Sequence, residues 1–76
     1  MDSKILALKA LNWYFFRKGD LVSANLVLRL LRTGSLTVGL ERESLMVELE
    51  LQSMGIAPRY NQAFTKATFS IRPTGP

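Results

Sequence analysis

Cysteine and histidine are both absent from this 76-residue chain. Their absence excludes a disulfide framework, a zinc finger, and catalysis by a thiol or an imidazole. The chain also has no Gly-rich phosphate loop, since Gly34 and Gly39 are isolated. Most of the glutamates are concentrated in one predicted helix, and the sequence offers no second group that would form a general acid–base pair with them in a cleft. We therefore expect no enzyme activity, metal, cofactor or small-molecule substrate.

Long apolar runs are missing as well. No uncharged apolar stretch reaches the roughly 18 residues of a transmembrane helix, so we expect no membrane span. Residues 1–16 have lysines inside their apolar run and no small-residue cleavage site, which is unlike a signal peptide. Attachment of this segment to a membrane surface is an alternative, but Lys4 and Lys9 form no strong polar face. A cytoplasmic protein without a membrane partner is expected.

Acidic residues are scarce towards the C-terminus. The net charge is +4 with a sequence pI near 10.0, so the chain should be attracted to polyanions. Residues 59–76 contain Arg59, Lys66 and Arg72 but no Asp or Glu, whereas residues 41–54 are rich in glutamate. A charge of this size also occurs in proteins where it serves solubility alone. The C-terminal cations are the best candidates for phosphate contacts.

Apolar residues, in contrast, are abundant. They make up 47% of a chain that has little interior in which to bury them. Surplus apolar surface is commonly covered by self-association, so a homodimer is expected.

Two helices are predicted in the first half of the chain. The first spans residues 3–17 and ends at Gly19 after two basic residues. Asp20 is suited to cap the second helix, which Thr33 and Gly34 end. The residues predicted to face the core are Ile5, Leu8, Leu11 and Phe15 in the first helix, and Leu21, Ala24, Leu28 and Leu31 in the second, with Val27 and Leu30 beside that second stripe.

A third helix is predicted from Glu41 to Met54, followed by Gly55 and by Pro58, which cannot continue it. Its inward side is predicted to consist of Val47, Leu51 and Met54. Residues 35–38, "SLTV", are either a short strand or the approach to this helix.

The period changes after Pro58. Residues 66–72, "KATFSIR", alternate in polarity, as expected of a half-buried strand with Ala67, Phe69 and Ile71 inward. An earlier strand near residues 57–60 would complete a hairpin, which must lie against the helices to be stable. With no linker or repeat, residues 1–76 are expected to form one domain.

In this order of elements, the chain resembles the winged helix–turn–helix family. The resemblance rests on "LVSANLVLRLL" in the second helix, "LELQSMGI" closing the third, and "APRYNQAFTKATFSIRPTG" as the wing. It implies an α+β, mostly helical fold of three helices followed by a C-terminal β-hairpin. The segment "RTGSLTVGL" is longer than the family's usual turn. In its small size the chain also resembles regulators encoded by plasmids and viruses, including those of archaea.

The resemblance implies a transcriptional regulator that binds double-stranded promoter DNA as a homodimer. Its third helix would enter the major groove, where Arg42 matches the acceptors of guanine. The turn and the wing would contact phosphates and the minor groove. The DNA-binding residues implied by position are Arg32, Thr33, Ser35, Thr37, Glu41, Arg42, Ser44, Arg59, Tyr60, Asn61, Gln62, Lys66 and Arg72.

Four consecutive aromatic residues, 13–16, point in every direction around the first helix. Phe15 belongs to the core stripe. Trp13 is expected to cover the core edge, and Tyr14 and Phe16 to point outward. We expect Trp13, Tyr14 and Phe16 to form the dimer interface, a role favoured over stacking on nucleic acid.

A different function remains open. The apolar excess and the acidic third helix are also typical of a small helical protein that binds and regulates or inhibits a host factor.

Overall fold

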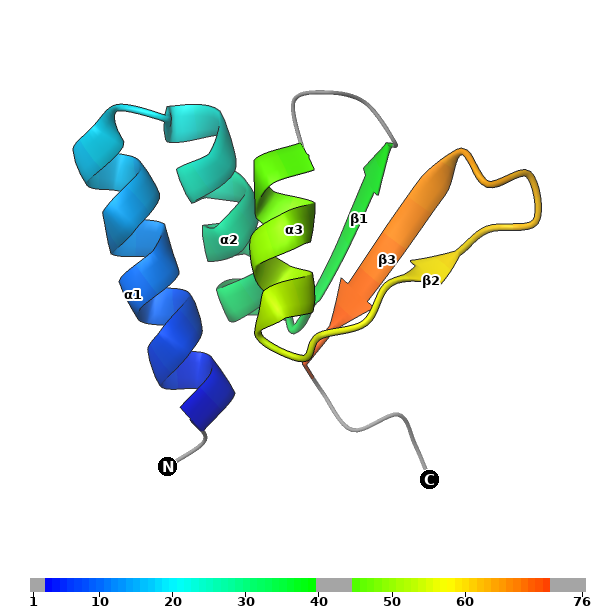
Figure 1. Ribbon diagram of the computed structural model, residues 1–76, viewed down its shortest axis with the longest axis horizontal. Coiled ribbons are helices and arrows are strands. Elements are labelled where there is room, and N and C mark those ends of the chain that lie inside the picture. Colours follow the sequence, from blue (N-terminus) through cyan, green and yellow to red (C-terminus); the bar gives the residue numbers. More distant parts are fainter. Residues whose placement is uncertain (1–2, 40–44, 72–76) are drawn as a thin grey trace.

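The fold is known from a computed structural model that describes residues 3–39 and 45–71. It is an α+β fold, mostly helical, with a three-stranded antiparallel sheet (Figure 1). The elements in chain order are α1 (Ser3–Lys18), α2 (Leu21–Thr33), β1 (Ser35–Gly39), α3 (Leu45–Ser53), β2 (Arg59–Tyr60) and β3 (Lys66–Ser70). The three predicted helices and the C-terminal hairpin are therefore present, together with one further strand.

The glycines predicted to end the helices do so by backbone geometry. Gly19 has a φ of 80°, and its N–H donates to the carbonyl of Phe16 while that of Asp20 donates to Phe15. This pair of bonds satisfies the last carbonyls of α1 and turns the chain sharply into α2. Gly34 ends α2 in the same left-handed region, with its N–H donating to Leu30. A residue with a Cβ would be strained at either position.

Asp20 caps α2, as the sequence predicts. One of its carboxylate oxygens accepts from the backbone N–H of Ser23 at 3.1 Å, and the other accepts from the Ser23 hydroxyl at 2.7 Å. These two bonds, with help from the charge of Lys18, lower the pKa of Asp20 below its ordinary value. The same contact explains how the polar Ser23 can be buried.

Replacing Asp20 by alanine is expected to destabilise the fold by about 1–2 kcal/mol, because it removes the cap and leaves the Ser23 hydroxyl unpaired. Urea denaturation at neutral pH measures this cost.

Asp20→Asn keeps an acceptor but removes the charge, so it should cost less. Because the folded pKa is lowered, the charge stabilises the fold above the unfolded pKa. The parent protein should therefore be more stable than Asp20→Asn at neutral pH, and this difference in the free energy of unfolding should disappear as the pH falls through the folded pKa. A pH-independent difference would contradict the assignment.

The sequence allowed residues 35–38 to be either a strand or the approach to a helix, and they form part of strand β1. The strand order is β1-β3-β2, so β3 lies in the centre and pairs with both neighbours. The pairing of β1 with β3 places Leu36 opposite Phe69 and Val38 opposite Ala67. All four of these side chains are buried, which confirms the alternation predicted for the C-terminal strand.

The core is one cluster to which all three helices and the sheet contribute. α1 packs along α2, and α2 in turn contacts β1 and α3. In Figure 1 the helices lie to one side, and the β2–β3 hairpin extends away from them. The buried apolar residues are Leu8, Leu11, Phe15, Ala24, Val27, Leu30, Leu36, Val38, Val47, Leu51, Ile56, Ala67 and Phe69.

The predicted inward face of α2 was partly wrong. Leu21 and Leu28 are exposed, whereas Ser23, Val27 and Leu30 are buried. The helix is therefore rotated so that the Ser23 side chain can turn inward, where Asp20 satisfies its hydroxyl. The apolar period alone did not distinguish these faces, because leucine and valine occur on both.

Candidate nucleic-acid interface

The face of the sheet turned away from the core is polar and basic. Residues paired across an antiparallel sheet share a face, so Arg59 lies on the side of its partner Thr68, which is also that of Thr37. The residues of this face, which we call the polar sheet face, are Ser35, Thr37 and Gly39 of β1, Lys66, Thr68 and Ser70 of β3, and Arg59 of β2. Among these described residues there are four hydroxyl groups and two cations, but no carboxylate.

Hydroxyl contacts order this face. The Oγ1 atoms of Thr37 and Thr68 lie 2.9 Å apart and share a hydrogen bond across β1 and β3. At the start of β1, the Thr33 hydroxyl donates to the carbonyl of Ser35 at 2.7 Å. The structure thus places Ser35, Thr37 and the two cations on one face of the sheet, with Thr33 bonded to Ser35 at its edge. Thr37 lies in β1, so of the two alternatives that the sequence left for residues 35–38 the strand is the one observed.

The loop between β2 and β3 is built around one side chain, that of Asn61. Its Oδ1 accepts from the backbone N–H groups of Thr65 and Lys66 at 2.8 and 2.9 Å. Its Nδ2 donates to the Thr65 hydroxyl at 2.8 Å. Asn61 therefore has a loop-building role, whereas the exposed Gln62 is available for other contacts.

An aromatic pair at this loop includes one residue that the sequence analysis missed. Phe64 is 69% exposed, and its ring centroid lies 5.9 Å from that of Tyr60. Its φ of 54° is the only positive value found for a non-glycine residue in the described ranges. The sequence offered one signal, an aromatic residue between Ala63 and Thr65 in a predicted loop.

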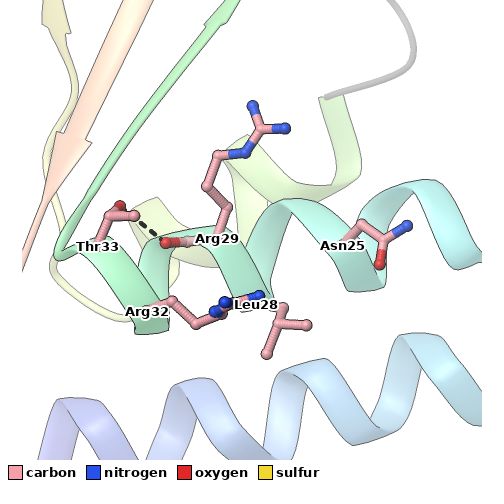
Figure 2. Close-up of a pocket in the computed structure, with 5 residues that line it drawn as sticks. All are labelled: Asn25, Leu28, Arg29, Arg32 and Thr33. Atoms are coloured by element: carbon pink, nitrogen blue, oxygen red, sulfur yellow. Dashed lines mark hydrogen bonds between the residues drawn. The ribbon is translucent and has the colours of Figure 1, made fainter.

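Arg32 lies elsewhere, on the outward face of α2. This face has a shallow hollow of about 550 Å³, lined by Asn25, Leu28, Arg29, Arg32 and Thr33. In Figure 2, Arg29 extends away from α1, while Arg32 and Leu28 lie on the side of α2 towards α1. The two guanidinium groups do not converge. Arg32 thus belongs to a helix surface and is not among the residues of the polar sheet face, although Thr33 of the same hollow bonds to Ser35.

The aromatic residues of α1 divide into two groups. Trp13 and Phe16 are 59% and 55% exposed and stack with their centroids 5.8 Å apart. The expectation that Trp13 covers the core edge was therefore wrong, because the helical period turns Trp13 away from Phe15. Tyr14 points to another side, where its ring receives the Lys18 ammonium at 5.1 Å. There it borders a hollow shared with Glu50 of α3 and with Met54, which follows α3.

The outward side of α3 is apolar rather than basic. Leu45, Met46 and Leu49 are each about half exposed, whereas Val47 and Leu51 are buried. Glutamate at position 48 is buried, and Glu50 lines the hollow beside α1. The described part of α3 thus offers no cation to a phosphate. The predicted reading residues Glu41, Arg42 and Ser44 lie outside the described residues, as does Arg72.

Within residues 3–39 and 45–71, no helix has the length and apolar character needed to cross a membrane. In the same residues, no group of three or more acidic side chains gathers as a metal ion would require.

Comparison of the chain with models of protein families, with curated proteins and with solved structures found no match.

Proposed function

We propose that this chain is a DNA-binding transcriptional regulator of the winged helix–turn–helix type that contacts DNA through its sheet and wing. The observation that carries the proposal is the polar sheet face. Hydroxyl groups and the cations Arg59 and Lys66 occur together there without a carboxylate among the described residues. Such a surface suits phosphate oxygens, which accept hydrogen bonds and attract cations.

The contacts can be assigned by chemistry. Arg59 and Lys66 would neutralise phosphates, and the exposed hydroxyls of Thr37 and Ser35 would donate to phosphate oxygens. Neither class of contact reads sequence. Base readout through Arg42, at the start of the third helix, is the part of the proposal that rests on the family resemblance alone, as does an origin in a plasmid or virus.

Salt dependence of DNA binding tests the proposal. Two phosphate contacts per protomer give a slope of about −1.8 in a plot of log affinity against log salt. Affinity for a duplex of about 20 base pairs should therefore fall at least about 12-fold from 50 to 200 mM salt. Fluorescence anisotropy measures this change. Absence of duplex binding at the lower salt concentration would refute the proposal.

A homodimer formed through α1 is part of the same proposal. Leu6, Trp13 and Phe16 leave a largely exposed apolar side on a helix that lies away from the sheet. Burying such surface against a second copy would remove it from water. The double variant Trp13→Ser/Phe16→Ser should therefore be monomeric by light scattering at concentrations where the parent protein is dimeric. The control is Leu49→Ser on α3. Loss of the dimer in the control alone would place the interface on α3.

A second candidate, a protein-binding regulator, is favoured by the apolar side of α3. Leu45, Met46 and Leu49 form an exposed apolar surface of the kind that protein partners bury. The two functions differ in their response to salt. Apolar association with a protein would persist at salt concentrations that release DNA.

A further inference from the structure

We propose that Phe64, supported by Tyr60, is a stacking surface for a nucleobase that has left its base stack. This inference rests on the proposed function and adds to it a second mode of contact besides phosphate binding. Phe64 is the most exposed of the large apolar side chains in the described residues. It lies in the β2–β3 loop, which Figure 1 shows extending away from the helices. A side chain in this loop is therefore accessible to a bound macromolecule.

The backbone holds Phe64 in this position at a cost. A bulky residue at a φ of 54° is strained, and such strain persists only where the surroundings enforce it. The enforcing contacts are the hydrogen bonds of the Asn61 side chain, together with the bond from the Phe64 N–H to the Asn61 carbonyl at 3.0 Å. The ring is thus presented by an ordered loop, where glycine or asparagine would be the unstrained choice.

The charges around the aromatic pair indicate the chemistry of its ligand. Arg59 and Lys66 occur in the same hairpin as the aromatic pair, and the described residues 59–71 contain no carboxylate. Tyr60 pairs with the buried Ala67, so it lies on the opposite face of the hairpin from these two cations. Around the edge strand β2, the hairpin therefore offers aromatic rings on one side and cations on the other. These are the two contacts that a nucleotide needs, stacking for the base and neutralisation for the phosphate. A purely apolar partner would have no use for the cations. The ring centroids of Tyr60 and Phe64 are 5.9 Å apart, so Tyr60 supports one edge of the surface.

The variant Phe64→Ala tests this inference. Two probes are used, a labelled single-stranded thymidine oligonucleotide of about 12 nucleotides and a duplex of about 20 base pairs carrying 2-aminopurine. Loss of one stacked base should weaken binding about 5- to 150-fold. The salt slope should stay unchanged, because stacking releases no counterion. Phe64→Trp should retain affinity, and Leu49→Ala, an equally conservative deletion on exposed α3, should bind like the parent protein.

The two probes identify where the base comes from. A loss limited to the single strand means that the ligand is an already unpaired base. A loss on the duplex, with 2-aminopurine fluorescence rising only when the parent protein binds, means that Phe64 unstacks a base step. Either result supports the stacking role.

Phe64→Gly separates the ring from the loop conformation, because glycine adopts the same φ without strain. It should bind as weakly as Phe64→Ala. Parent-like affinity of either variant for both probes would overturn the inference, even if salt-dependent binding by the parent protein upheld the proposed function. Absence of binding by the parent protein would instead remove the proposed function itself.

Discussion

Replacing Phe69 by alanine is expected to destabilise the fold by about 3–5 kcal/mol. The Phe69 side chain is fully buried on the central strand, opposite Leu36, and its removal leaves a cavity between the sheet and the helices. A domain of this size has a total stability of about 4–11 kcal/mol, so the variant should lose a large fraction of its stability. Circular dichroism and urea denaturation of the variant and the parent protein measure the loss.

Phe64→Ala is the matched control for this prediction, since it removes the same ring from an exposed position on the same hairpin. It should change the free energy of unfolding by less than about 1 kcal/mol. Equal costs at the two positions would mean that burial does not explain the stability of the hairpin.

The double variant Arg59→Ala/Lys66→Ala is expected to reduce DNA affinity about 60-fold at 0.1 M salt. Each phosphate contact contributes about 0.9 to the slope of log affinity against log salt, so two contacts contribute about 1.8. Taking 1 M salt as the concentration at which these contacts no longer add affinity, their loss at 0.1 M salt costs about 1.8 log units. The reduction should be uniform across DNA sequences, because phosphates carry no sequence information. Anisotropy titrations at several salt concentrations give both the affinity and the slope, which should become less steep by about 1.8.

Lys9→Ala/Arg29→Ala is the charge-matched control. It also removes two exposed cations, but from α1 and α2 rather than from the sheet. It should lower affinity only slightly, through the reduced net charge. An equal loss in both double variants would show that binding follows the overall charge and that the polar sheet face has no special role.

Local signals in the sequence predicted the helices and their ends well. Gly19 and Gly34 end α1 and α2, Asp20 caps α2, and the residues predicted to face the core in α1 are buried or partly buried. Each of these features depends on residues within a few positions of one another. The alternation of residues 66–71 predicted β3 for the same reason.

Features that depend on distant residues were harder to predict. β1 is a strand because it pairs with β3, about half a chain length away, and "SLTV" alone does not reveal that partner. The inward turn of Ser23 depends on a hydrogen bond rather than on hydropathy. Phe64 is exposed because Asn61 shapes its loop, whereas an isolated phenylalanine in a sequence is usually assigned to a core.

Of the candidate site, the cations of the hairpin could be predicted because no acidic residue occurs near them in the sequence. Their position beside Thr37 and Ser35 could not, since those residues reach the same face only through the register of β1 on β3. Arg32, close to Ser35 in sequence, lies instead in α2 and lines the hollow on that helix.

The central place of β3 also determines when the sheet can form during synthesis. β1 and β2 do not pair with each other, and each finds its partner only in Lys66–Ser70. A nascent chain can form its three helices early. β1, however, has no strand to pair with, and its apolar side stays exposed, until residue 70 has been synthesised. The helices are thus available to a chaperone or an early partner before the polar sheet face exists, and a message truncated before β3 would yield no such face at all.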